Sequence, residues 1–295
     1  MKGDILMNKK KGVIGVIIVV ICIVAVVAGF YINKSKKEEA RNKVKEDYNL
    51  SDEEMKTLTD EDIKKLANDE AKVEVKEVKK PTKDSLDVDK IAGFDYQNQK
   101  NVGGLTLPYK VEKTDLVVEN IGQYTGQFIE DGSDKPVVNV LSLLVTNNSN
   151  EVVQYAEINL KVNGNKNAVF KVTNLPPKTS TLVMESTGKI EFNKDDKYTY
   201  VDSIQAKLDK MSLLEDKIKI TKQEDGVIGI KNISGKDLDT VYVYYKYFQQ
   251  GGAYLGGITY RVKFENVKAG ATVEEKTSHF SKNSSDILMV DVINN

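Results

Sequence analysis

Apolar and polar positions alternate with a period of two along much of the chain after residue 110. Two segments show this most clearly, VVQYAEINLKV at 152–162 and ITYRVKFE at 258–265. In each segment, one side of an extended strand is apolar and the other is polar, which is typical of a strand half buried against a core. The inward sets are Val152, Ala156, Ile158, Leu160 and Val162 in one, and Ile258, Tyr260, Val262 and Phe264 in the other. Several such strands, separated by clusters of Asn, Gly, Asp and Ser, predict a mainly β chain of antiparallel β-sandwiches.

A continuous apolar run near the N-terminus predicts a different structure. From Val13 to Ile32 there are 20 residues without a charge, most of them Val or Ile. As a helix this run would span roughly 30 Å, the thickness of the hydrocarbon core of a bilayer. We expect a transmembrane helix over 12–33, inserted in the lipid bilayer after a short cytoplasmic tail over 1–11. The alternative is a cleaved signal peptide, but the apolar cores of signal peptides usually have about 7 to 15 residues.

Lysine residues flank this run on both sides, so the positive-inside rule does not decide its orientation. The region C-terminal to the run is long, polar and rich in predicted strands, and it contains no second apolar run of that length. A short basic tail inside, with the remainder outside, is the commonest arrangement for such a chain. We therefore expect a single-pass protein of the cell membrane whose C-terminal region is extracellular.

The segment 34–80 contains 14 acidic and 13 basic side chains, too much charge to bury. Two helix starts can be recognised in it, Ser51 with Glu54 and Thr59 with Asp62, each pair spaced as in a capping box. A thin apolar stripe accompanies them, made of Met55, Leu58, Ile63 and Leu66. This pattern predicts a solvated helical stalk, with a partner-binding helix as the alternative. Residues 81–110 show little periodicity and contain several Gly and Pro residues, so we expect a linker there.

The strand-rich region contains an internal repeat, with modules expected over 111–215 and 216–295. VTNNSNEVVQYAEINLKV matches IKNISGKDLDTVYVYYKY, which aligns Asn147 with Asn232. Further on, FKVTNLPPKTS matches VKFENVKAGAT, which aligns Asn174 with Asn266. The two asparagines of a copy are 27 residues apart in the first and 34 apart in the second. The second copy therefore carries seven more residues between two of its strands.

Those additional residues fall in VYVYYKYFQQGGAYLGGITYRVKF at 241–264. The simplest interpretation of QQGGAYLGG is the elongated tip of a β-hairpin, because glycine adopts backbone angles that other residues resist. A phosphate-binding loop is disfavoured because the segment has neither a G-x-G-x-x-G pattern nor a Walker-type lysine. Exposed tyrosine is common in binding surfaces. The candidate binding residues are Tyr242, Tyr244, Phe248 and Tyr254. The alternative is a strand covered on both faces by the stalk, the linker or the neighbouring module.

Composition argues against several classes of function. The net charge is -1, and only Arg41 and Arg261 of the 43 basic residues are arginine, so we expect no nucleic acid as a partner. The single cysteine, Cys22, lies within the apolar run and lacks the small residue that precedes a lipid-bearing cysteine. With one histidine, His279, in the whole chain, we expect neither a zinc site nor another cofactor.

Signals for catalysis or calcium binding are weak. A Ser–His–Asp set could be drawn from Ser278 or Ser281 with His279 and Asp286, but no serine has a nucleophile-elbow context. The acidic segments DGSD at 131–134 and DVD at 87–89 do not match the twelve-residue calcium loop. A pair of carboxylates for glycoside hydrolysis stays open, although no spacing proposes one.

The order of motifs in 111–295 resembles the FxLYD-type and related immunoglobulin-like domains of Gram-positive cell-envelope proteins. The resemblance rests on the Asn-x-Ser turn, the alternating strand, the hairpin, and NLPPKTS or NVKAGAT leading into another strand. The aromatic-x-Leu-Tyr-Asp run that names the family is missing, and INLKVNG and YKYFQQG stand in its place. The resemblance implies a β-sandwich without catalytic residues.

Together these patterns predict a membrane-anchored, non-enzymatic binding or scaffold protein of the bacterial cell envelope. Its expected partner is an envelope protein or a cell-wall component. Two alternatives remain open at this point: a cell-wall enzyme with an unrecognised acidic pair, and a purely structural spacer or assembly subunit.

Overall fold

The structure of the chain is a computed structural model that describes residues 36–46, 48, 50, 52–67, 80–82 and 84–294. The chain divides into two compact units, Met1–Ala67 and Asn68–Asn295. The transmembrane helix predicted over 12–33 lies outside the described residues. Among the helices that are described, none has both the length and the apolar character needed to span a membrane.

The first unit is helical, as the charged segment predicts. It contains a helix over 36–46, α2 (Asp52–Thr57) and α3 (Asp60–Ala67). The predicted cap at Thr59 is confirmed: the Thr59 Oγ1 donates to Asp62 Oδ2 at 2.6 Å, and the Asp62 backbone N–H donates back to Thr59 Oγ1 at 3.2 Å. The predicted start at Ser51 lies outside the described residues.

These helices are not a fully solvated rod. Helices this short are marginal in isolation, so most of their stability must come from packing. The apolar stripe supplies that packing, and the side chains that meet in a small core of their own are Val44, Tyr48, Leu50, Met55, Ile63 and Leu66. An exposed rod would leave this stripe in water, which explains why the segment folds back on itself.

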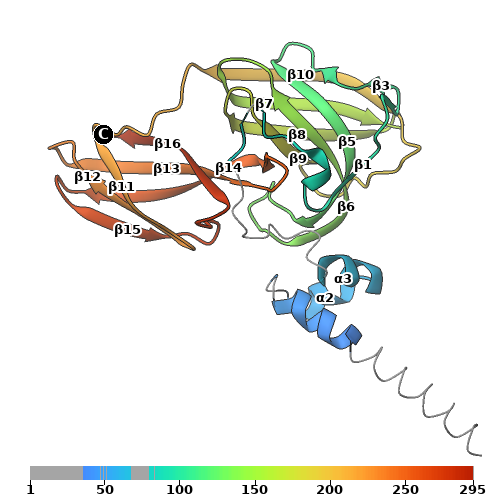
Figure 1. Ribbon diagram of the computed structural model, residues 1–295, viewed down its shortest axis with the longest axis horizontal. Helices are drawn as coiled ribbons and strands as arrows, with labels where there is room; N and C mark the ends of the chain where they lie inside the picture. Colours follow the sequence, from blue (N-terminus) through green and yellow to red (C-terminus); the bar gives the residue numbers. More distant parts are fainter. Residues whose placement is uncertain are drawn as a thin grey trace, which may run out of the picture. The chain divides into compact units, whose positions relative to one another are not determined.

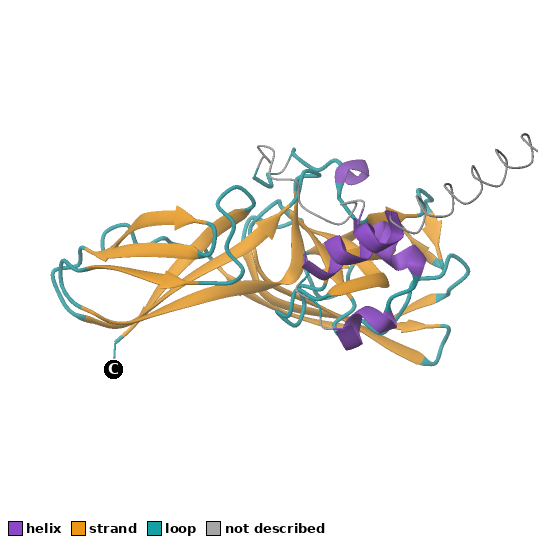
Figure 2. Cartoon of the chain, turned by 90° about the horizontal axis from the view of Figure 1, so that it is seen from below, coloured by secondary structure: helices purple, strands orange, loops and turns teal. Residues whose placement is uncertain are grey.

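The second unit is mainly β, as the period-two pattern predicts (Figure 2). Its short N-terminal elements are η1 (Val88–Lys90), β1 (Phe94–Tyr96), β2 (Asn101–Val102), β3 (Leu105–Thr106) and β4 (Tyr109–Lys110). The strands of the first module are β5 (Leu116–Gln127), β6 (Pro136–Asn147), β7 (Val152–Val162), β8 (Lys166–Leu175), β9 (Ser180–Met184) and β10 (Tyr198–Leu208). Those of the second are β11 (Ile218–Glu224), β12 (Val227–Asn232), β13 (Leu238–Phe248), β14 (Ala253–Val267), β15 (Thr272–Lys276) and β16 (Ser285–Ile293).

The two modules repeat one topology. In the first, the strand orders are β5-β6-β9 and β10-β7-β8, and in the second the corresponding orders are β11-β12-β15 and β16-β13-β14. The aligned asparagines also make matching hydrogen bonds in the two copies. Asn147 Nδ2 donates to the Glu151 and Leu175 carbonyls, and its Oδ1 accepts the backbone N–H of Ser149 at 3.0 Å. Asn232 makes the matching bonds to Lys236, Val267 and Ser234.

The modules are nevertheless joined through a shared sheet. Strand β9 of the first module pairs in parallel with β14 of the second, over Ser180–Leu182 and Ala253–Leu255. This pairing makes one eight-stranded sheet of order β1-β5-β6-β9-β14-β13-β16, with β4 also paired to β5 (Figure 1). The boundary expected at 215/216 therefore divides two repeats but not two separate sandwiches.

The segment 81–110 is not a linker. It forms η1 and strands β1 to β4, and β1 and β4 extend the shared sheet beside β5. Its scattered apolar residues are buried, namely Ile91, Phe94, Val102, Leu105 and Leu107. The strands are only two or three residues long, too short for a period of two to be recognised in the sequence.

The two hydrophobic cores also cross the boundary between modules. One core brings Tyr124 and Leu182 of the first module together with Val243 and Phe264 of the second. The other core, between β5-β6-β9 and β10-β7-β8, takes in Phe248 and other residues of the second module. Each large apolar side chain buried in this way stabilises the fold by roughly 1.5–3 kcal/mol, so the two modules stabilise each other.

Candidate functional site

The four candidate binding residues share one side of the β13-β14 pair but differ in exposure. Tyr242 and Tyr244 lie partly exposed on the outer side of the second module. Phe248 is 3% exposed and Tyr254 is 2% exposed, and both belong to the core of the first module. The expectation that these two are exposed is therefore wrong, because the first module covers this end of the hairpin. For Tyr242 and Tyr244, a binding role stays a prediction.

The exposed part of this side carries two tyrosines and an arginine among charged neighbours, since strand pairing also places Lys263 and Asp291 opposite Tyr242. The rings of Tyr242 and Tyr244 lie 6.2 Å apart at 45°, and the Arg261 guanidinium lies 4.7 Å from the centre of the Tyr242 ring. Strand pairing places Met289 opposite Tyr244, and Ile293, which is 46% exposed, opposite Thr240. We call the surface made of Tyr242, Tyr244, Arg261, Met289 and Ile293 the tyrosine face.

The first module provides an internal comparison for this surface. By the repeat alignment, Glu157 and Asn159 stand where Tyr242 and Tyr244 stand in the second module. In the first module this side is polar, and its side chains hydrogen-bond one another: Asn159 Nδ2 and Tyr155 Oη each donate to the Glu157 carboxylate at 3.0 Å. A strand of this fold therefore does not need aromatic residues at these positions.

The seven additional residues of the second copy build the junction between modules. Opposite Lys246, the register of β13 and β14 shifts, from Tyr245↔Tyr260 to Tyr247↔Leu255. This bulge brings β14 against the first module so closely that a Cβ on Gly257 would lie 1.7 Å from the Lys171 carbonyl oxygen. The glycine pair Gly256-Gly257 is thus a site of close backbone approach, and the hairpin interpretation of QQGGAYLGG is correct but incomplete.

A buried lysine donates hydrogen bonds to backbone carbonyls at this bulge and on the neighbouring strand β8. Lys246 is 0% exposed, whereas Lys161, at the matching repeat position, is exposed. The Lys246 ammonium donates to the carbonyls of Gly257 at 2.8 Å, Thr173 at 3.3 Å, and Ile258. Three acceptors match the three N–H groups of an ammonium, which favours the charged form.

Glu130 balances this charge from the first module. Its carboxylate accepts the Gly257 N–H at 2.9 and 3.0 Å and the Met184 N–H at 2.9 Å. Burial raises the pKa of the Glu130 carboxyl, against the opposing effect of the backbone N–H groups and of Lys246. Burial likewise lowers the pKa of Lys246, against the effect of Glu130. Sequence reasoning missed this pair because its members lie 116 positions apart in different modules, and Lys246 occupies an ordinary outward position of its strand.

The serine triad considered from the sequence does not assemble. His279 Nδ1 contacts Asp134 Oδ2 at 2.8 Å, and the Tyr260 hydroxyl donates to the other oxygen of Asp134 at 2.6 Å. The His279 ring stacks on the Tyr260 ring with 4.5 Å between centres. Asp286, the expected partner, instead accepts hydrogen bonds from Lys80 and from Tyr254. The contacts of Asp134 with His279 and Tyr260 join the two modules, and none of these contacts involves a serine nucleophile.

The acidic segments considered for calcium are also engaged elsewhere. Asp131 accepts the Ser133 N–H, Asp87 pairs with Lys90, and Asp89 accepts the Tyr96 hydroxyl. Within the described part of the chain, no group of three or more His, Cys, Asp or Glu side chains is arranged to hold a metal ion.

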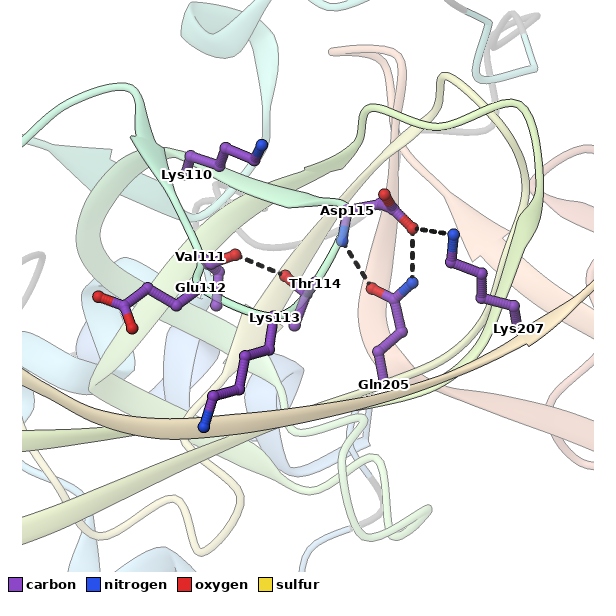
Figure 3. Close-up of a pocket in the computed structure, with 8 residues that line it drawn as sticks. All are labelled: Lys110, Val111, Glu112, Lys113, Thr114, Asp115, Gln205 and Lys207. Atoms are coloured by element: carbon purple, nitrogen blue, oxygen red, sulfur yellow. Dashed lines mark hydrogen bonds and ion pairs between the residues drawn. The ribbon is translucent and has the colours of Figure 1, made fainter.

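A cleft of about 710 Å³ lies between the β4–β5 loop and β10 (Figure 3). Its polar groups bind one another: Asp115 N–H donates to Gln205 Oε1 at 2.8 Å, and Gln205 Nε2 donates to Asp115 Oδ2 at 2.7 Å. Lys207 pairs with the same carboxylate at 2.8 Å. The charged ends of Lys110 and Lys113 point apart in Figure 3. These contacts pair the polar groups of the cleft with one another and do not converge on a common point.

No protein-family model matches the chain, and no curated protein matches it.

Proposed function

We propose that the chain is a non-enzymatic binding protein whose tyrosine face is the docking surface for a macromolecular partner. The observation that carries this proposal is the pair Tyr242 and Tyr244 beside Arg261, on a sheet face that is polar in the sister module. Tyrosine and arginine are the side chains enriched at the centres of protein interfaces, because each combines a large contact area with polar groups.

The shape and chemistry of this surface support a macromolecule over a small substrate. The face is built on neighbouring strands of one sheet, with paired residues side by side. The Arg261 guanidinium is held over Tyr242 and makes no hydrogen bond or ion pair with another described residue. Its N–H groups can therefore receive acceptors from a partner without first breaking an internal bond.

We further propose that residues 12–33 anchor the chain in the cell membrane and that the β modules lie outside it, as part of the cell envelope. The support is the uncharged run from Val13 to Ile32 and the polar, strand-rich remainder. Protease added to intact cells is expected to remove residues 111–295 and to spare the tail. Protection of these residues in intact cells, with cleavage after lysis, would refute the outside location.

Site-specific crosslinking tests the docking surface. A photoreactive amino acid is placed at position 244 of the full chain, and, as a matched control, at position 155 on the polar face of the first module. We expect a discrete crosslinked product from position 244 only, and we expect Tyr242→Ser to reduce its yield. Equal products from both positions, or none from position 244 while the protein is present at the cell surface, would instead support a spacer.

A further inference from the structure

A segment N-terminal to the first module crosses the tip of the β13–β14 hairpin. Asp87 N–H donates to the Gly251 carbonyl at 2.8 Å, and Ser85 Oγ lies 3.3 Å from the Gly252 carbonyl oxygen. We call residues 84–91 the strap. The strap contacts residues more than 160 positions away in the sequence.

The hairpin tip is shaped to receive the strap. Gly252 has a φ of +71°, and a Cβ on it would lie 2.1 Å from the Ser85 carbonyl oxygen. A Cβ on Gly251 would lie 2.4 Å from the Ile91 Cγ1. The glycine pair Gly251-Gly252, like Gly256-Gly257, thus allows a close backbone approach that no other residue permits.

The closed tip holds a polar group without a partner. Gln249 is 1% exposed, and neither its amide nitrogen nor its amide oxygen has a hydrogen-bond partner among the described residues. An unpaired buried amide costs free energy that water would remove if the tip opened. The closed state of the tip therefore carries the free-energy cost of this unpaired amide. The hydrogen bonds between the strap and the tip help to hold the tip closed despite that cost.

One further contact involves Lys80, which precedes the strap in the sequence. Lys80 pairs with Asp286, and the same carboxylate accepts the Tyr254 hydroxyl at 3.1 Å. The Lys80 side chain is 66% exposed, so this ion pair lies at the surface and is weak. If the Lys80 contact is lost, the Tyr254 hydroxyl is still bonded to Asp286, but the Asp286 carboxylate is itself less restrained.

We propose that residues 84–91 are a releasable strap that gates the tip of the β13–β14 hairpin. With the strap in place, residues 249–255 are closed against the first module, and Ala253–Leu255 pair with β9. When the strap lifts, the tip opens, the parallel pairing with β9 loosens, and the unpaired Gln249 amide gains access to water.

Hydrogen exchange of the full chain, read by mass spectrometry, tests the strap. We compare Gly252→Ala with Gly235→Ala, because Gly235 has a similar φ of +76° but nothing within 4 Å of its Cβ position. The two substitutions share the cost of a positive φ and differ in the clash with the strap. For Gly252→Ala we expect about tenfold faster exchange in 84–91, 249–255 and 180–182, and for Gly235→Ala no change there.

A substitution of opposite effect completes the test. Gln249→Met removes the unpaired amide at similar side-chain length and is expected to slow exchange in 249–255 severalfold. If Gly252→Ala does not fold, Ser85→Ala, which removes the hydroxyl bonded to Thr82 and Gly252, is expected to give the same pattern more weakly. Exchange that rises evenly across all strands of the β unit, or that is equal in the two glycine variants, overturns the proposal. The measurement contains no partner, so failure of the crosslinking test leaves it unaffected.

Discussion

Replacing the buried lysine tests the account of the module junction most directly. Lys246→Met keeps an unbranched chain of similar length and removes the ammonium that donates to three backbone carbonyls. It also leaves the Glu130 carboxylate without its nearby positive charge. Leaving a buried charge without its partner costs about 3–5 kcal/mol; because the half-buried Glu130 keeps its hydrogen bonds from Gly257 and Met184, we expect a loss at the lower end, about 3 kcal/mol. Typical domains are stable by about 5–15 kcal/mol, so the loss would be a large share of the total.

The assay is equilibrium unfolding in urea, followed by circular dichroism or by tyrosine fluorescence, since the chain has 14 tyrosines and no tryptophan. The matched control is Lys161→Met, which makes the same change at the equivalent but exposed position of the first module. Surface substitutions of this kind usually change stability by less than about 0.5 kcal/mol. A difference of several kcal/mol between the two variants would therefore be due to the junction.

The pH dependence of the variant gives a second, independent check. Burial raises the pKa of Glu130 above its ordinary value of 4.5, and without Lys246 less remains to oppose that rise. The folded state of the variant then binds this proton more tightly than the unfolded state does, so its stability falls as the pH rises from 4.5 through the raised pKa. The penalty of Lys246→Met should be larger at about pH 8 than at about pH 5. A penalty below about 1 kcal/mol, or one that shrinks as the pH rises, would refute this account of the pair.

Three further predictions concern the repeat, the bulge and the buried tyrosines. Asn147→Ala and Asn232→Ala should each lower the free energy of unfolding, measured in urea, by about 2–3 kcal/mol, because each leaves buried carbonyls unpaired. The two losses should be similar because the two asparagines make matching hydrogen bonds. Gly257→Ala should lower the melting temperature more than Gly164→Ala, although Gly164 has the positive φ of +73°, because only the former meets a carbonyl oxygen. Burial and Asp134 raise the pKa of Tyr260, so in an alkaline titration followed by ultraviolet absorbance it should ionise only when the chain unfolds.

The local structure of the strands could be predicted because its causes are local. The alternation in 152–162 places Ala156, Ile158 and Leu160 inward, and all three are buried in the structure. The repeat was recognisable for a similar reason. Asn147 and Asn232 each accept a hydrogen bond from the backbone of the turn that follows them. Each asparagine is therefore constrained by its own neighbours in sequence.

The errors share one physical cause, which is contact between segments distant in sequence. Tyr254 has the pattern of an exposed residue on its own hairpin and is buried by the core of the other module. Segment 81–110 has no period of its own, yet it adds strands to a sheet formed by later residues. Lys246 differs from Lys161 in burial, although both occupy the same position of the repeat. No property of a single strand separates these cases.

The repeat also explains why the shared sheet forms at β9 and not at its counterpart β15. The two strands hold the same place in their modules, at one end of β5-β6-β9 and of β11-β12-β15. β9 reads STLVM, has no charge and is fully buried, whereas β15 reads TVEEK and is mostly exposed. Charged side chains protect an open strand edge from pairing with another strand, and an uncharged edge needs cover. The seven additional residues supply that cover by extending β14 alongside β9. The insertion in the second module and the uncharged edge of the first module thus depend on each other. Replacing Thr181 or Leu182 with glutamate should therefore separate the modules, even though every residue of the hairpin is retained.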